Sequence, residues 1–122
     1  MNFIYTGINH VQLAAPKGSE MEVRNFYGQL LKMEEIEKPE NLKKRGGVWF
    51  LCGNNQLHIG VQEDFVPAKK AHPAIELRNL DSLRKHLIDS GTEIIEDETL
   101  EGFKRFYVSD PFGNRIEFLE RT

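Results

Sequence analysis

The sequence predicts an α+β protein made of two tandem β-α-β-β-β modules that form a cupped mixed sheet. Three observations lead to this prediction: strand and helix periodicities follow the order β-α-β-β-β, this order occurs twice, and the two halves overlay with a nearly constant offset. The chain has 122 residues, which is enough for one hydrophobic core and short for two independent ones. We therefore expect a single domain over residues 1–122, with module 1 at about 5–64 and module 2 at about 70–120.

The first module opens with a strand and a helix. Apolar residues alternate with others over residues 8–14, which predicts a strand with His10 and Gln12 on one face. Ser19 and Glu22 then have the spacing of a capping box, in which each side chain accepts a hydrogen bond from the other's backbone N–H, so a helix should begin there. Its apolar stripe consists of Val23, Phe26, Tyr27, Leu30 and Leu31.

Three strands complete the first module. A short strand is expected near residues 34–38, and the apolar run at 48–52 predicts the next one. Gly53-Asn54 contains residue types that tolerate positive φ, so it suits a two-residue hairpin turn into a last strand at 55–61.

The second module repeats the same order. Residues 72–77 predict a strand, Asn79 can cap the helix that follows, and Gly91 suits the position just after that helix ends. The helix carries its apolar side chains at Leu80, Leu83, Leu87 and Ile88. The remaining elements are short strands at 93–97 and 104–108, a turn at 110–114 and a final strand at 115–119.

The duplication places four metal-ligating side chains at equivalent positions. His10 on the first strand of module 1 pairs with His72, 62 residues later, and His58 on the last strand pairs with Glu117, 59 residues later. A lone strand histidine is more often an ordinary surface residue than a ligand, but four such residues at symmetric positions favour a common site. Because side chains alternate across a strand, we expect all four on the concave, helix-free face of the sheet.

The donor types indicate one divalent metal ion. Imidazole and carboxylate groups suit Zn, Ni, Mn or Fe(II), and these positions offer no thiolate of the kind found in structural zinc sites. The sequence therefore predicts His10, His72 and Glu117 as ligands, with His58 as either a fourth ligand or a proton shuttle.

Neighbouring side chains suggest a place for a substrate. Gln12 and Glu76 share the faces of the two first-strand histidines, and Trp49 lies opposite His58 if the hairpin turn has two residues. Trp49 has an equally good interpretation as a core residue.

Four segments carry a resemblance: Asn9-His10-Val11, Phe26-Tyr27-Gly28, His72-Pro73-Ala74-Ile75-Glu76 and Asp110-Pro111-Phe112-Gly113-Asn114-Arg115-Ile116-Glu117. Together they resemble the vicinal-oxygen-chelate superfamily, which includes glyoxalase I, fosfomycin-resistance transferases, methylmalonyl-CoA epimerase, extradiol dioxygenases and metal-free bleomycin-resistance proteins. The resemblance covers nearly the whole chain, and the last segment is the most specific.

The resemblance implies a cupped sheet around a metal ion, often with each site shared between the two chains of a homodimer. It also implies that Arg105 and Tyr107 approach the cavity. At the position of His58, superfamily members more usually carry Glu or Gln, so this chain departs from the paired-glutamate proton chemistry of glyoxalase I.

The expected function is therefore that of a glyoxalase-like metal-dependent lyase, isomerase or transferase. It would act on a small oxygen-chelating metabolite by Lewis-acid stabilisation of an oxyanion, with Glu117 and His58 as catalytic groups. Two alternatives stay open: an extradiol-type dioxygenase with Fe(II), and a non-catalytic ligand- or drug-binding protein of the bleomycin-resistance type.

Composition indicates which classes of partner and which cellular compartment to expect. The net charge of −3, with scattered basic residues, argues against a nucleic-acid partner. No run of 18 apolar residues and no secretory leader is present, which argues against a membrane partner. Cys52 is the single cysteine, so no intrachain disulfide forms, and a cytoplasmic homodimer that binds a small-molecule substrate is expected.

Overall fold

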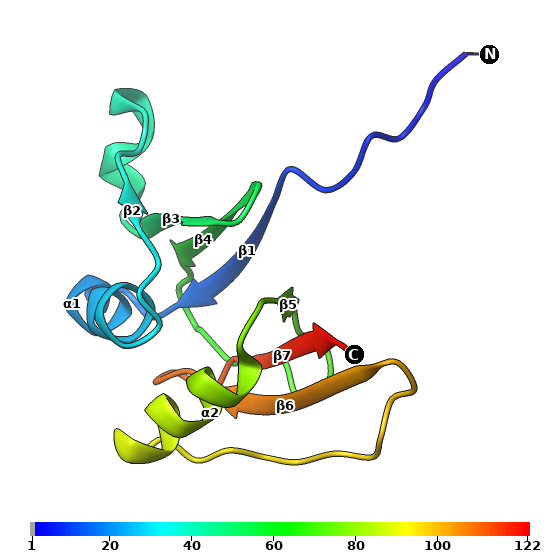
Figure 1. The fold of residues 1–122 in the computed structure, drawn as a ribbon. Coiled ribbons are helices and arrows are strands. Elements are labelled where there is room, and N and C mark those ends of the chain that lie inside the picture. The colour runs from blue at the N-terminus through cyan, green and yellow to red at the C-terminus, as the bar shows by residue number, and fades with distance from the viewer. Residues whose placement is uncertain (1) are drawn as a thin grey trace. The chain divides into compact units, whose positions relative to one another are not determined.

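The computed structural model describes residues 2–122, and its contacts divide the chain into two compact units (Figure 1). The first unit ends at Phe65 and the second covers Val66–Thr122. Each unit combines helix with one mixed β-sheet, so the α+β class and the duplication are confirmed. The single domain stays a prediction. No helix in residues 2–122 combines the length and apolar character needed to cross a bilayer.

The first unit has a four-stranded sheet in the order β1-β4-β3-β2. β1 is parallel to β4, whereas the β2–β3 and β3–β4 pairs are antiparallel. In chain order the elements are β1 (His10–Ala15), α1 (Glu20–Val23), the π-helix η1 (Arg24–Leu30), β2 (Glu35–Ile36), the 3₁₀-helix η2 (Glu40–Arg45), β3 (Val48–Cys52) and β4 (Asn55–Val61).

The second unit has a sheet in the order β5-β7-β6, with β5 parallel and β6 antiparallel to β7. Its elements are β5 (Ala74–Glu76), α2 (Leu80–Asp89), β6 (Phe103–Ser109) and β7 (Arg115–Arg121). A single bridge between Ile95 and Tyr107 stands where β2 stands in the first unit. The strand predicted at 93–97 is wrong beyond this bridge, since the residues after Ile95 are charged and exposed.

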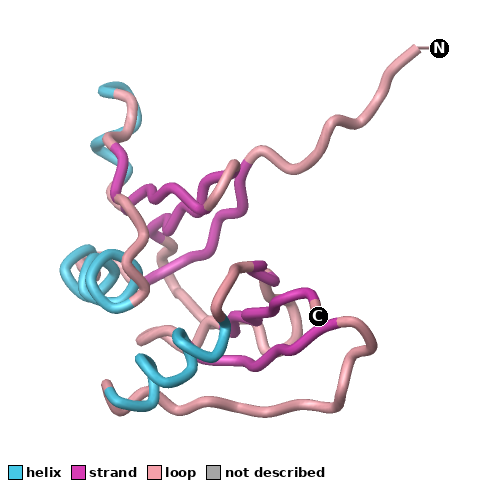
Figure 2. The backbone as a smooth tube through the Cα atoms, viewed as in Figure 1, coloured by secondary structure: helices cyan, strands magenta, loops and turns pink. Residues whose placement is uncertain are grey.

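One face of each sheet packs against helix, as Figure 2 shows for each unit. On this face of the first unit the buried apolar side chains include Val23, Phe26, Tyr27, Val48, Phe50, Leu57 and Ile59. In the second they are Leu80, Leu87, Phe106, Val108, Ile116 and Phe118. Burying each of these side chains contributes roughly 1.5–3 kcal/mol, and the alternation along the strands leaves the other face for polar groups.

The capping box predicted at Ser19 does not form. The Ser19 hydroxyl donates to the carbonyl of Pro16 at 2.5 Å, and its backbone lies outside the extended region that an N-cap adopts. The helix also changes character after Val23, where it widens into a π-helix. The apolar spacing predicted helix correctly but did not distinguish the α form from the π form.

The N-terminus of α2 is capped by a side chain from β7. Asn79 has φ +66° and makes no side-chain cap, so the predicted role of its side chain is wrong. Instead, the backbone N–H groups of Asn79 and Leu80 each donate at 3.0 Å to the carboxylate of Glu120 on β7. The predicted C-terminal signal is confirmed, since Gly91 follows the helix with φ +84°.

Candidate functional site

In the first unit, three rings form a stack on the face away from the helices. Trp49 lies opposite His58 in the β3–β4 register, as the two-residue turn predicted. The Trp49 and His58 ring centroids are 3.8 Å apart with planes 4° from parallel, and His10 stacks at 4.3 Å from the other side of His58. His58, only 4% exposed, is therefore fixed by packing between two rings.

Hydrogen bonds set the orientation of both imidazoles. The Nε2 atom of His58 lies 2.8 Å from the Gln56 side-chain oxygen, and Nδ1 of His10 lies 2.9 Å from that of Asn9. Burial lowers the pKa of His58, and the charges of His10 and Lys38 lower it further. A neutral imidazole is the form that can bind a metal or accept a proton.

Gln12 borders this stack, and Trp49 forms one end of it. Gln12 pairs with His58 in the β1–β4 register, and its amide lies over Gly60, where an added Cβ would approach Nε2 to 2.8 Å. Gly60 thus makes room for the Gln12 side chain. Trp49 also lines an open cavity of about 290 Å³ at the edge of the sheet, together with Ile36 and Lys38. A half-buried indole between a histidine and a cavity is more accessible than an ordinary core residue.

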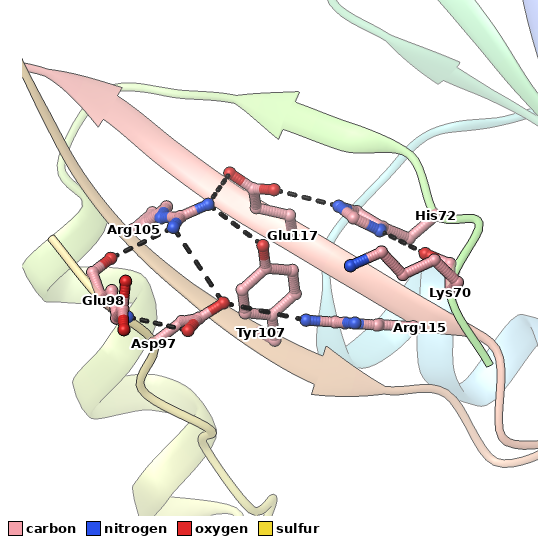
Figure 3. A network of polar contacts seen from close by, with 8 residues as sticks. All are labelled: Lys70, His72, Asp97, Glu98, Arg105, Tyr107, Arg115 and Glu117. Atoms are coloured by element: carbon pink, nitrogen blue, oxygen red, sulfur yellow. Dashed lines mark hydrogen bonds and ion pairs between the residues drawn. The ribbon is translucent and has the colours of Figure 1, made fainter. Parts of the chain in front are cut away.

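In the second unit, His72 and Glu117 are in direct contact (Figure 3). His72 Nε2 lies 3.0 Å from Glu117 Oε1, while Nδ1 donates to the carbonyl of Lys70 at 2.8 Å. His72 precedes β5 rather than lying within it, so the predicted strand 72–77 begins too early. The Pro73 carbonyl nevertheless accepts a hydrogen bond from the Glu117 N–H at 3.0 Å, which ties this segment to β7.

A polar network surrounds the Glu117 carboxylate, which is 6% exposed. Burial opposes ionisation, but hydrogen bonds from His72 and Tyr107 and the charge of Arg105 outweigh it, so the pKa of Glu117 is lowered. Burial, and then the contact with Glu117, raise the pKa of the Tyr107 phenol. At neutral pH the site therefore contains a carboxylate and a neutral phenol that donates to it.

Two arginines extend this network. Arg105 Nη1 lies 3.0 Å from the Tyr107 hydroxyl and 3.5 Å from Glu117 Oε2. The Arg115 guanidinium lies over the Tyr107 ring at 4.0 Å, and Asp97 lies 3.9 Å from both arginines. Arg115 and Asp97 were missed at the sequence level. Arg115 could have been found, because residues two apart on a strand share a face and Arg115 precedes Glu117 by two.

Glu76, the remaining predicted contact, lies on β5. Its carboxylate forms an ion pair with Arg121 at 3.0 Å, and both side chains are largely exposed. The register places Glu76 opposite Leu119, two residues beyond the Ala74–Glu117 pair. Glu76 therefore shares a face with Glu117, as the strand alternation predicted, but belongs to a separate ion pair.

The turn before β7 fixes the start of the strand that carries Glu117. Asp110 is buried and accepts hydrogen bonds from the backbone N–H groups of Phe112 at 2.9 Å and Asn114 at 2.8 Å. Its second oxygen accepts from the Asn114 side chain at 2.8 Å. The Asp110–Asn114 segment is thus a turn closed by its own side chains, as its composition predicted.

The chemistry of the donor set fits a divalent metal ion. His72 is oriented through Nδ1 by a backbone carbonyl, the arrangement usual for metal-bound histidines, and Nε2 faces a carboxylate oxygen. Within either unit, over residues 2–122, no group of three or more His, Cys, Asp or Glu side chains is arranged to hold an ion by itself. Each unit brings two of the predicted donor side chains into contact: His10 with His58, and His72 with Glu117.

Comparisons with known proteins place these observations in a family. A sequence model of the Glyoxalase/Bleomycin resistance protein/Dioxygenase superfamily matches residues 7–118. A crystal structure from Bacillus anthracis, described as a glyoxalase family protein, is 56% identical with a TM-score of 0.97, and the match covers 100% of both chains. No match to a curated protein was found.

More distant structures share the fold. A glyoxalase/dioxygenase from Nostoc punctiforme is 18% identical with a TM-score of 0.79, covering 100% of this chain and 99% of that one. Lactoylglutathione lyase from Agrobacterium tumefaciens is 17% identical with a TM-score of 0.75, covering 95% and 94%.

Proposed function

Because the chain belongs to the Glyoxalase/Bleomycin resistance protein/Dioxygenase superfamily, we propose that it is a metal-dependent enzyme acting on a small metabolite with two adjacent oxygen atoms. The reaction class is that of the glyoxalase-like lyases, isomerases and transferases. The observation that carries the proposal is the contact between His72 and Glu117 at 3.0 Å, with the imidazole oriented from behind by the Lys70 carbonyl.

The proposed ligands are His10, His72 and Glu117, with the two pairs meeting either in one chain or across a homodimer. A divalent ion held there supplies a Lewis acid for an enolate or another developing oxyanion. Its binding requires neutral imidazoles and an ionised carboxylate, so the ion would replace the proton that His72 Nε2 donates to Glu117 in the metal-free chain. The lowered pKa of Glu117 supports this state of the carboxylate, and burial of His58 favours the neutral form of that ring.

His58 is the proposed proton acceptor or fourth ligand. Its ring is sandwiched between Trp49 and His10 and its Nε2 is engaged by Gln56, so its free nitrogen has a fixed direction. A base held in one orientation transfers a proton more efficiently than a rotating one. Replacing His58 by Gln keeps a metal-ligating oxygen but removes the proton acceptor, so it separates the two roles.

The other side chains position the reacting groups. Tyr107 and Arg105 hold Glu117 in the ionised form, and Gln12 lies beside the His58 stack. The proposed substrate contacts are Gln12, Trp49, Glu76, Arg105 and Tyr107.

A vicinal-oxygen chelator tests this function directly. The metal-free protein is loaded with Mn(II), and the relaxation of water protons is measured while acetohydroxamate is added, with acetamide as the single-oxygen control. We expect acetohydroxamate, which binds through two adjacent oxygens, to lower the relaxation enhancement by displacing coordinated water, and acetamide to have little effect. A loaded protein that responds equally to both compounds, or His72→Ala that responds like the native chain, contradicts the proposal.

The proposed metal ligands also favour a second candidate function. Two histidines and one glutamate form the facial triad of Fe(II) oxygenases, so an extradiol-type dioxygenase is the alternative. Oxygen consumption by the Fe(II)-loaded protein with catechol supports this alternative, whereas its absence leaves the lyase or isomerase reading.

A homodimer is part of the proposal. Superfamily resemblance motivates it, because sites in this superfamily are often shared between two chains. Sedimentation at micromolar concentration that detects the monomer alone contradicts it.

A further inference from the structure

An acidic side chain lies between two arginines next to Glu117. Asp97 Oδ2 is 3.9 Å from Nη2 of Arg105 and 3.9 Å from Nη2 of Arg115, and Figure 3 shows it reaching toward both. Both distances are too long for hydrogen bonds. The carboxylate is therefore attracted by two guanidinium groups without being bonded to either.

The arginines have donors that these contacts do not use. Arg105 Nε is buried and has no hydrogen-bond partner, although the side chain also donates through Nη2 to the Glu98 carbonyl at 3.0 Å. Arg115 stacks on Tyr107, and among residues 2–122 the Asp97 carboxylate is the one anionic group within ion-pair distance of it. A buried N–H without an acceptor is costly, so an anion that approaches these groups more closely is favoured.

Asp97 is also easy to displace. It lies in an exposed stretch whose only regular features are the isolated bridges at Ile95 and Leu100, and its side chain is 42% exposed. Exposed ion pairs at this distance contribute little. Asp97 Oδ1 also accepts a hydrogen bond from the Glu98 N–H at 2.7 Å, which water can replace at this exposed position. Moving Asp97 into water therefore loses little, provided that another anion takes its place between the arginines.

We propose that Arg105, Arg115 and the ring of Tyr107 form a carboxylate-binding site, and that Asp97 occupies it as an internal competitor until a substrate carboxylate replaces it. Arg105 Nη1 is 3.5 Å from Glu117 Oε2, so the site adjoins the proposed metal ligand. That the incoming anion belongs to the substrate rests on the proposed function, whereas the binding of the anion does not.

Charge balance selects a carboxylate over a phosphate. The two guanidinium groups are matched by two carboxylates, Glu117 and Asp97. A monocarboxylate that replaces Asp97 keeps this balance, and its planar pair of oxygens fits the fork of an arginine. A phosphate dianion would add one negative charge beside Glu117. The substrate class is then a small acid with one carboxylate in addition to the two oxygens that the metal would bind.

The test uses the metal-free 122-residue chain, so it does not depend on the metal site. The Nε–H signals of Arg105 and Arg115 are followed by ¹⁵N-edited NMR during titration with sodium acetate, and with sodium chloride or phosphate at matched ionic strength. We expect acetate to move both signals in a saturable way and chloride to leave them in place. Phosphate that binds more tightly than acetate contradicts the assignment of a carboxylate.

Three variants test the competition. Asp97→Asn should bind acetate about five-fold more tightly, the factor that corresponds to loss of one exposed ion pair. Glu101→Gln, an exposed glutamate four residues further on, removes the same charge and should bind acetate like the native chain. Arg115→Gln should weaken acetate binding about ten-fold, because it removes a charge-assisted contact.

The outcomes separate this proposal from the proposed function. Equal acetate affinity in Asp97→Asn and Glu101→Gln overturns the competitor role, and unchanged Arg105 and Arg115 signals overturn the site. Thermal melting of each variant confirms that it is folded before titration. Acetate binding in a protein that binds no metal leaves this site in place and removes the proposed metal-dependent activity.

Discussion

The two units hold equivalent side chains by different forces. In the first, His58 is buried between the rings of Trp49 and His10, and burial, followed by the charges of His10 and Lys38, lowers its pKa. In the second, Glu117 is held by hydrogen bonds and by the charge of Arg105. Duplication therefore places His58 and Glu117 at equivalent positions of the two units. The residues around each side chain decide whether packing or electrostatics holds it in place.

This difference matches the two roles proposed for His58 and Glu117. Stacking in a buried setting keeps an imidazole neutral, which suits a ligand or a proton acceptor. Hydrogen bonds and a guanidinium keep a carboxylate ionised, which suits a ligand for a divalent cation. Perturbing packing should thus affect the first unit most, and removing polar partners should affect the second.

The largest expected effect comes from removing the charge of Glu117. Glu117→Gln keeps the shape of the side chain but removes the anionic ligand, so metal affinity should fall by more than the roughly 10–100-fold typical of residues that only contact a ligand. Competition with a fluorescent chelator measures this. Glu76→Gln is the matched control, since it removes a carboxylate from the same face of the same sheet, and it should leave metal affinity nearly unchanged. Equal losses in both variants contradict the account.

Packing in the first unit is tested at two glycines. Gly47 has φ +87°, and a Cβ there would collide with the backbone carbonyl of Ile59, so Gly47→Ala should destabilise the protein by about 3 kcal/mol or more. Gly60→Ala meets only the flexible end of Gln12 and should cost less than about 1 kcal/mol. Urea denaturation measures both. A larger loss for Gly60→Ala than for Gly47→Ala is the contrary result.

Tyr107→Phe and Trp49→Phe compare the polar contacts around Glu117 with the ring packing around His58. Tyr107→Phe keeps the ring under Arg115 but removes the hydroxyl that contacts Glu117, so metal affinity should fall about ten-fold. Trp49→Phe keeps an aromatic ring against His58, so its effect should be smaller. Isothermal titration with Zn(II) compares the two variants, and an equal or greater loss in Trp49→Phe counts against the contrast drawn above.

The smallest effect concerns a carboxylate that anchors backbone. Glu20 accepts a hydrogen bond from the Gly47 N–H at 2.9 Å, and this bond is the main reason that the pKa of Glu20 is lowered from 4.5. A lowered folded-state pKa stabilises the protein above the unfolded value, and the benefit disappears as pH falls through the folded value. Glu20→Gln should therefore be about 1 kcal/mol less stable at pH 7 and nearly equal to the native chain well below pH 4.5.

Denaturation at several pH values provides the measurement for Glu20→Gln. Glu22→Gln, which changes an exposed glutamate in the same helix, is the control and should differ little from the native chain at every pH. A loss of stability in Glu20→Gln, relative to the native chain, that grows on acidification would falsify the anchoring role.

Much of this arrangement could be predicted from sequence because local patterns encode it. The apolar run and the turn after it predicted β3 and β4 at their observed bounds, and Gly53-Asn54 set the register that places Trp49 opposite His58. The repeat predicted which residues would share a unit, since His72 and Glu117 lie 45 positions apart yet are in contact.

The parts that escaped prediction depend on contacts between distant segments. Nothing local to Asn79 reveals that Glu120 will cap its helix, or that Ser19 will donate to Pro16 instead of capping. Asp97 looked like part of a strand, and its position between two arginines follows from tertiary structure. Side-chain partners across a fold are therefore the limit of reasoning from one sequence.

The most direct test of the central claim is metal stoichiometry in two variants, one from each unit. We expect one tightly bound divalent ion per chain in protein purified without chelators, measured by plasma emission spectrometry. His10→Ala and His72→Ala should each lose that same ion, because both histidines are proposed ligands of it. Retention of a full equivalent in either folded variant, or two independent ions of which each variant loses one, contradicts the account.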